Sequence, residues 1–344
     1  MYKKFFMGIA AMAALTLVSC SSEDLNSLSD NSSKNEAISF DGYLGRSAVS
    51  VNGSRGSVLE IGNLKTSTDG FGVFGNYKND DGTEFGSNWF DNVPVTYKDA
   101  KWTYSPVKYW LPKGHIDFLA YAPYVNGTTL KNTSCIDFTV ENEVANQKDL
   151  LWAKVTNQTK ENISNTENKV KFKFAHALSR LGYTVKLKEA YSDATITLNK
   201  ITLAGSEDGT TKKAFYKGGT IDLSYTSSTT ASLWNTSSSD KQNFTWFSGN
   251  QILTDKVANN TEYLFVIPQD FSATDKLYVI VEYTIQNNGV TEKMTNTVYQ
   301  QIKMNFLQGK AYMINLTIGL TPIEFDAYVT PWADGDKIDD ITWN

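Results

Sequence analysis

The 344-residue chain contains only two cysteines and two histidines. Its sequence has no zinc-ligand spacing, no nucleophile elbow and no phosphate-binding loop. His115 and His176 are therefore expected to be structural or loop residues rather than bases or metal ligands. Cys135 lacks a catalytic partner motif and is expected to be a buried structural thiol. These absences predict a protein that is not an enzyme, with no catalytic residues, no metal and no cofactor.

Positive charge is also scarce. Asp and Glu together number 37 against 32 for Lys and Arg, which gives a net charge of −5 and a pI near 5.2. This balance argues against nucleic acid as a partner. Near the C-terminus, the acidic stretch from Asp334 to Asp340 partly resembles a calcium loop, but it lacks the full order of ligands that such loops need. We interpret this stretch as a solvated tail.

Long apolar runs are missing except near the N-terminus, where residues 5–18 follow Lys3 and Lys4. This run is too short to span a bilayer comfortably. It ends in Leu17-Val18-Ser19-Cys20, which is typical of a bacterial lipobox. The sequence therefore predicts a lipoprotein signal peptide over 1–19, lipid on Cys20 and a flexible tail over 20–36. An ordinary secretory signal with a chance cysteine, or a short membrane anchor, is the alternative.

The rest of the chain shows no sustained helical periodicity. Short apolar runs alternate with polar residues and are separated by clusters of Gly, Asn, Asp and Ser. The runs most typical of strands are 71–74, 116–121, 183–187, 196–203, 263–268 and 277–285, with turn signals at 79–82 and 287–289. Many short strands with this spacing predict an all-β fold of antiparallel β-sandwiches, and two sandwiches fit the length. If Cys20 carries lipid, no intrachain disulfide is possible.

Nearly the same heptapeptide occurs at both ends of the chain, as ISFDGYL at 38–44 and as IEFDAYV at 323–329. Alternate residues of a strand share one face. The residues that share a face are Ile38, Phe40, Gly42 and Leu44 in the first copy and Ile323, Phe325, Ala327 and Val329 in the second. One groove cannot hold both copies, so either two grooves exist or the copies compete for one. Chance also produces such matches in a chain of this length.

Only three residues are arginine, namely Arg46, Arg55 and Arg180. Two of them follow the first heptapeptide in small, turn-like flanks that are typical of protease-accessible loops. Cleavage after Arg46 would release the lipid anchor and the first strand together. The second heptapeptide of another molecule could then fill the open groove. A solvated loop charge is the alternative for each arginine, and for Arg55 alone it is the better interpretation.

Several motifs along the chain occur in the order found in the Bacteroidetes fimbrillins, the FimA/Mfa-like major pilins of type V pili. They are the lipobox, Ile38-Ser-Phe, Gly70-Phe-Gly-Val-Phe-Gly, Tyr109-Trp-Leu-Pro, Phe118-Leu-Ala-Tyr-Ala-Pro, Asp149-Leu-Leu-Trp-Ala, Val170-Lys-Phe-Lys-Phe-Ala-His-Ala-Leu-Ser-Arg-Leu, Lys310-Ala-Tyr and Val329-Thr-Pro-Trp332. Each motif is weak alone, and their order carries the resemblance. The resemblance covers nearly the whole chain.

This resemblance implies a specific architecture. Family members have two tandem transthyretin-like β-sandwich domains and reach the outer-membrane surface as lipoproteins. With the soft boundary at 157–187, we expect a first strand and propeptide at 37–46, an N-terminal sandwich at 47–172, a C-terminal sandwich at 173–320 and a donor-strand segment at 321–344. Before proteolysis we expect a monomer whose residues 38–44 pair in the first domain and whose C-terminal tail is loosely docked or disordered.

The resemblance also implies a function. An arginine-directed surface protease removes the anchor and first strand, here after Arg46 or Arg55. Stalk subunits then polymerise with other copies and other fimbrial subunits by placing the C-terminal segment in the vacated groove, with Ile323, Phe325, Ala327, Val329 and Trp332 as donor residues. The alternatives are a tip adhesin or glycan-binding surface lipoprotein, an uncleaved anchor subunit and, least favoured, a surface hydrolase.

Overall fold

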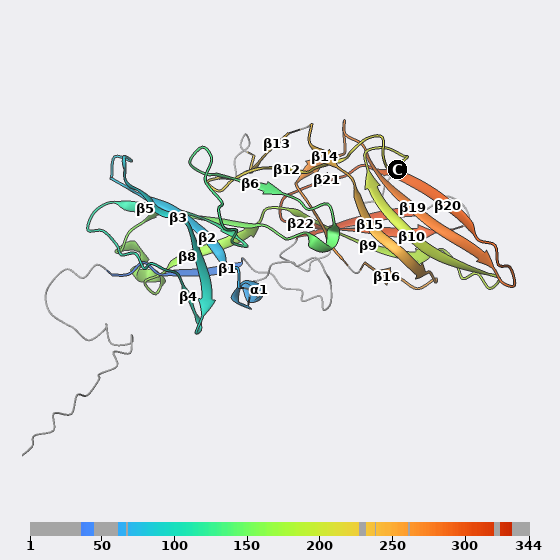
Figure 1. The fold of residues 1–344 in the computed structure, drawn as a ribbon, viewed down its shortest axis with the longest axis horizontal. Helices are drawn as coiled ribbons and strands as arrows, with labels where there is room; N and C mark the ends of the chain where they lie inside the picture. Colours follow the sequence, from blue (N-terminus) through green and yellow to red (C-terminus); the bar gives the residue numbers. More distant parts are fainter. Residues whose placement is uncertain are drawn as a thin grey trace, which may run out of the picture. The chain divides into compact units, whose positions relative to one another are not determined.

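The computed structural model describes residues 36–44, 61–66, 68–226, 232–237, 239–260, 262–319 and 324–331. Within these residues the protein is almost entirely β, which confirms the predicted fold class (Figure 1). The longest helix described, α1 (Ile61–Thr66), has six residues, and no helix in the described part of the chain is long and apolar enough to cross a membrane.

The elements up to residue 176 form the first half of the fold. They are β1 (Phe40–Leu44), α1, β2 (Phe71–Lys78), β3 (Glu84–Lys98), β4 (Lys101–Thr103), β5 (His115–Ala122), β6 (Cys135–Thr139), η1 (Val144–Asn146), β7 (Leu151–Gln158), η2 (Asn162–Thr166) and β8 (Val170–His176). Seven of the strands make one sheet in the order β1-β8-β7-β5-β2-β3-β4. Its two end strands, β1 and β4, contact each other. The sheet therefore curves around a core of its own.

That core is rich in aromatic side chains, which come from every strand of the sheet except β7 and from Trp110 in the β4–β5 connection. Its fully or almost fully buried rings are Phe40, Phe71, Tyr77, Phe90, Trp102, Trp110, Phe118, Phe172 and Phe174. Many of these rings meet edge to face, as the ring quadrupoles favour; the centroids of Phe71 and Trp102 lie 4.9 Å apart. Leu64 of α1 is fully buried in the same cluster, so the short helix covers part of this core.

The elements after residue 178 form the second half. They are β9 (Ser179–Leu187), β10 (Ala194–Ala204), β11 (Phe215–Tyr216), β12 (Gly218–Asp222), β13 (Trp234–Thr236), β14 (Lys241–Gln242), β15 (Phe244–Ile252), β16 (Ala258–Asn259), β17 (Leu264–Val266), β18 (Gln269–Asp270), β19 (Leu277–Asn287), β20 (Met294–Ile302), β21 (Asn305–Phe306), β22 (Lys310–Ile318) and β23 (Glu324–Pro331). One sheet has the order β15-β10-β19-β20 and another has the order β16-β9-β22-β23. Their inner faces share one hydrophobic cluster; Tyr183 of β9 meets Trp246 of β15 at 4.9 Å between ring centroids.

The second cluster also contains residues from the first half of the chain. Phe74 of β2 and Tyr121 of β5 belong to it, because they lie on the outer face of the first sheet. The strand β6 pairs antiparallel with β12. Residues on both sides of the expected domain boundary therefore share one core, and the two expected domains are not separate in their packing.

Most strand pairs are antiparallel, but two are parallel. These are β1 with β8 and β9 with β22. The stretch 157–169, which begins the expected boundary region 157–187, contains the end of β7 and the helix η2, and it joins β7 to its antiparallel neighbour β8. It is therefore a connection inside the first sheet.

Candidate functional site

The segment 36–44, which ends in β1, is held on two sides by hydrogen bonds. On one side it runs parallel to β8, with Phe40 opposite Val170 and Leu44 opposite Phe174, and the Val170 amide donates to the Ser39 carbonyl at 2.8 Å. On the other side lies the segment 104–110. There the Ile38 amide donates to the Lys108 carbonyl at 2.8 Å, and the Trp110 amide donates to the Glu36 carbonyl at 2.9 Å. Residues 36–44 thus lie in a groove between two separate parts of the chain, β8 and the segment 104–110.

One face of this strand is buried as the sequence predicts. Ile38 and Phe40 are 1% and 3% exposed, Gly42 is buried and Leu44 is half-buried, whereas Tyr43 on the other face is 46% exposed. The Phe40 ring is enclosed by four others, those of Phe90, Tyr104, Phe118 and Phe172, at centroid distances of 5.3–5.6 Å. Loss of this strand would open the core at its most aromatic point.

Gly42 lies where the groove is narrow. A Cβ atom placed on it would come within 3.1 Å of Phe174 Cε2 and 3.7 Å of Phe71 Cε1. A methyl group at this position therefore fits only if the Phe174 ring moves by a few tenths of an ångström. The residue that corresponds to Gly42 in the second heptapeptide is Ala327.

Tyr104 links residues 36–38 to the segment 104–110 through hydrogen bonds of its side chain. Its hydroxyl donates to the Ile38 carbonyl at 2.8 Å and accepts from the Lys108 amide at 3.2 Å. Burial raises the pKa of the Tyr104 hydroxyl to about 12, because the anion would lose its hydration. Sequence reasoning missed this residue. It stands close to the recognised motif Tyr109-Trp-Leu-Pro, but no local pattern says that the segment will pair with residues 36–38.

A raised tyrosine pKa makes stability depend on pH at the alkaline end. In the unfolded chain the Tyr104 pKa is near 10, so its contribution to stability is complete below pH 10 and is lost as the pH rises through 12. We expect the free energy of unfolding, measured with urea, to fall between pH 9.5 and pH 11.5. Burial also raises the pKa of Tyr77, Tyr121, Tyr183 and Tyr312.

The Tyr104→Phe variant measures how much that hydroxyl contributes to the free energy of unfolding. It should be less stable than the wild type near pH 8 by about 0.5–1.5 kcal/mol for each of the two hydrogen bonds that are lost. Because it cannot ionise at this position, the difference should shrink as the pH rises. Two curves that stay parallel up to pH 11.5 would contradict this role.

The second heptapeptide lies in a different sheet. The strand β23 pairs antiparallel with β22, with Val329 opposite Tyr312 and Thr317 opposite Glu324, and Val329 packs half-buried against the second cluster. The tail is thus paired over 324–331, although we expected it to be loosely docked or disordered. It pairs because β22 would otherwise be an edge strand with a free row of backbone donors and acceptors. In one chain, the two copies do not compete.

Several of the predicted site residues lie outside the described residues. They are Cys20, Arg46, Arg55, Ile323, Trp332 and the acidic stretch 334–340. Phe325 and Ala327 lie within β23. The roles assigned to these residues stay predictions.

The histidine and cysteine predictions can be compared with their surroundings. His176 is buried at the end of β8, and its Nδ1 lies 2.7 Å from Oδ2 of the fully buried Asp149, just before β7. This pair joins two of the motifs that carried the family resemblance. His115 begins β5. Cys135, expected to be buried, is half-buried at the start of β6. Within the described ranges, no three His, Cys, Asp or Glu side chains gather as a metal site would need.

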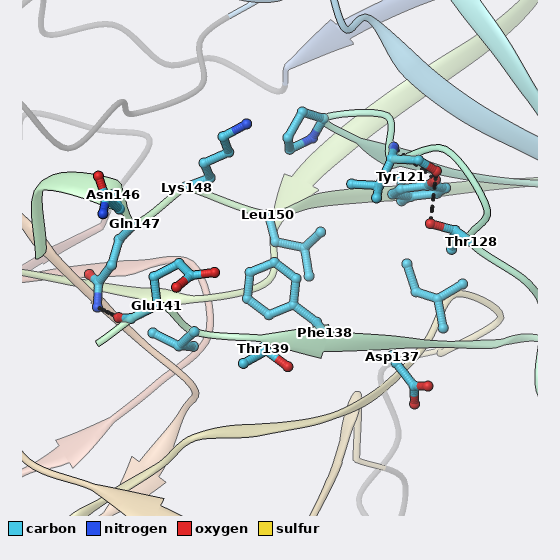
Figure 2. Close-up of a pocket in the computed structure, with 14 residues that line it drawn as sticks. Tyr121, Thr128, Asp137, Phe138, Thr139, Glu141, Asn146, Gln147, Lys148 and Leu150 are labelled. Carbon is cyan, nitrogen blue, oxygen red and sulfur yellow. Dashed lines mark hydrogen bonds between the residues drawn. The ribbon is translucent and has the colours of Figure 1, made fainter. Parts of the chain in front are cut away.

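A cavity of about 330 Å³ lies beside β6. Its lining comes from 121–128, 136–141 and 146–150, and Figure 2 shows Phe138 and Leu150 near its centre, with Glu141 and Lys148 among the polar side chains around them. Gln147 is engaged elsewhere, since it donates to the Glu141 carbonyl and accepts from the Phe265 amide. The cavity is lined by neither of the two histidines nor by a cysteine.

Comparison with known proteins gives one family. The model of the family described as fimbrillin-like matches residues 59–332. Among solved structures, the chain resembles a Bacteroides uniformis protein provisionally described as a cell adhesion protein, with a TM-score of 0.51, 17% identity and coverage of 86% of this chain and 98% of that one. A Bacteroides ovatus protein with the same description gives a TM-score of 0.50, 15% identity and coverage of 88% and 100%. At these identities the likeness shows the fold. No curated protein matches the chain.

Proposed function

Because the chain belongs to the fimbrillin-like family, we propose that it is a structural subunit of a cell-surface fimbria that supports adhesion. In this proposal Cys20 carries lipid and takes the precursor to the outer membrane. The subunit then assembles with other copies of itself and with other fimbrial subunits. The provisional description of the Bacteroides proteins of the same fold as cell adhesion proteins supports the adhesive role.

Maturation begins with a cut by an arginine-directed surface protease after Arg46 or Arg55. Both arginines follow β1, which ends at Leu44, and both precede residue 59, where the family match begins. Such a cut separates β1 from the rest of the chain, so that only non-covalent contacts retain it. The hydrogen bonds to β8 and to 104–110 and the enclosed Phe40 ring are then the contacts that a replacement strand must reproduce.

Polymerisation follows when the C-terminal segment of one subunit fills the vacated groove of the next. The observation that carries this step is that the second heptapeptide repeats Ile38 and Phe40 in order and has Ala and Val in place of Gly42 and Leu44. Phe325 would take the place of Phe40, and Ala327 would take the place of Gly42. Strand addition supplies backbone partners to both sides of the groove. Burial of Ile323, Phe325 and Val329 contributes roughly 5–9 kcal/mol at about 1.5–3 kcal/mol each.

The N-terminus of the protein sheared from cells tests this proposal directly. We expect mass spectrometry to find a chain that starts at Ser47 or Gly56 and lacks β1. In an Arg46→Ala variant, the start should move to Gly56 or revert to the lipidated Cys20, which identifies the residue that is cut. Lys65→Ala, a change of another positive residue that is exposed in α1, should leave the N-terminus unchanged.

A lipidated Cys20 at the start of every sheared chain would contradict the role of a cleaved subunit that polymerises by strand exchange. The protein would then be an uncleaved anchor subunit or a surface lipoprotein that binds a glycan. The cavity beside β6 is the place where such a glycan would be sought, because Phe138 and polar side chains lie together there.

A further inference from the structure

The strand β20 is a long and unprotected sheet edge. Its nine residues, MTNTVYQQI, contain no charged side chain and no proline. It pairs with β19 over Met294–Ile302 without any bulge, and it is the last strand of its sheet (Figure 1). Its other side therefore offers a straight row of backbone donors and acceptors, which is a template for pairing with another chain.

The other sheet edges in the described part of the chain are each protected. The edge strands β4, β11, β13, β14, β16, β17, β18 and β21 have two or three residues. The strand β1, at the end of the seven-stranded sheet, carries Asp41 and contacts β4. On β15 the register with β10 is interrupted twice. The strand β6 carries Asp137, and β23 carries Glu324, Asp326 and Pro331. Short strands, bulges, charges and proline are the usual means of blocking edge pairing, and β20 uses none of them within its length.

We infer that β20 is an interaction surface for a second copy of this chain, which pairs through its own β20 in antiparallel orientation. A twofold axis perpendicular to the sheet would continue the four-stranded sheet into one of eight strands. It would also keep the core faces on one side, so that the Val298 side chains of the two copies, which pack half-buried against the second cluster, lie diagonally across the new strand pair.

The outer face and the ends of the strand support the same partner. Tyr299 is 50% exposed and lies opposite Ile280, beside a small outer cluster that includes Tyr278. A second copy would bring another Tyr299 ring next to it, while the Tyr299 hydroxyl keeps its hydrogen bond to the Glu207 side chain. Lys293 and Lys303 flank the strand. A pair centred on Val298 would set these lysines against each other, so we expect the centre to shift to Thr297 or Tyr299.

The test uses residues 21–344, uncleaved, so that every described element is present and β1 fills its groove. Sedimentation should show a monomer–dimer equilibrium that shifts with concentration between about 1 and 200 μM, the usual range for weak interfaces. The Thr297→Lys variant adds a charge to an exposed edge position and should weaken dimerisation by about tenfold or more. Thr245→Lys is the matched control, because Thr245 is exposed on β15 at the opposite edge of the same sheet.

Hydrogen exchange locates the interface without any substitution. Amides of 294–302 should gain protection as the concentration rises, whereas those of 244–252 should not. A wild type that remains monomeric at 200 μM would overturn the inference, and so would a Thr297→Lys variant that dimerises as well as Thr245→Lys. The inference does not rest on strand exchange: dimers formed through β20 are expected to dissociate in detergent, and the uncleaved chain forms them without a vacant groove.

Discussion

Replacement of Phe325 by aspartate is expected to abolish detergent-resistant polymers while the subunit itself stays folded. In the proposed fibre, this side chain enters the space that Phe40 fills in the precursor. In the precursor the Phe40 side chain is only 3% exposed to solvent, and the rings of Phe90, Tyr104, Phe118 and Phe172 surround it. A carboxylate there would be unpaired and unhydrated, at a cost on the order of several kcal/mol or more.

The matched control is Tyr328→Asp, which adds the same charge to the same segment. Its counterpart in the first heptapeptide is Tyr43, whose side chain is 46% exposed, so a carboxylate at this position would face water in the fibre. We expect ladders of polymers on a denaturing gel for Tyr328→Asp and only monomer for Phe325→Asp. Thermal melts of both uncleaved subunits should show cooperative unfolding, because β23 is an edge strand whose sheet retains β16, β9 and β22. Equal ladders from both variants would contradict strand exchange.

The second large effect is expected at Phe40, and its size depends on the state of assembly. The Phe40→Ala substitution removes a ring that contacts four others, so it should lower the free energy of unfolding of the precursor by about 3–5 kcal/mol. In the assembled fibre β1 has been discarded, so the same substitution should change nothing. Tyr43→Ala, on the exposed face, should stay within about 0.5 kcal/mol in either state.

Urea unfolding of the uncleaved subunit and of the cleaved polymer measures both halves of this prediction. A fibre that loses stability together with its Phe40→Ala precursor would show that β1 remains in its groove. Strand replacement would then be wrong even if cleavage after an arginine were observed.

Several parts of this structure follow from local sequence alone. The alternation at 38–44 predicts one buried face, because a strand repeats every two residues; Ile38, Phe40 and Gly42 are buried there, Tyr43 is exposed, and Ser39, Asp41 and Leu44 are half-buried. The turn signals predict the β2–β3 and β19–β20 hairpins, where the amides of Gly82 and Val290 donate to the carbonyls of Asn79 and Asn287. Both features depend on residues that are neighbours in the chain.

The features that position the groove do not follow from local sequence. The parallel pairing of β1 with β8, the contact of residues 36–38 with 104–110 and the Asp149–His176 pair all join distant segments. A periodic pattern says which face of a strand is buried but not which strand lies beside it. For the same reason, the pairing of β23 with β22 was not expected, since it depends on an edge that exists only after the second sheet has formed.

The location of β1 and β23 in one polypeptide has a consequence for the timing of assembly. While β1 is covalently attached, its effective concentration at its own groove is on the order of millimolar or higher, far above that of any incoming tail. Gly42 fits that groove without displacing Phe174, whereas an alanine methyl does not. On the proposed mechanism, proteolysis therefore sets when assembly starts, because a subunit can accept the strand of a neighbour only after it has been cut. Fibre growth then begins where the protease is and not along the export route.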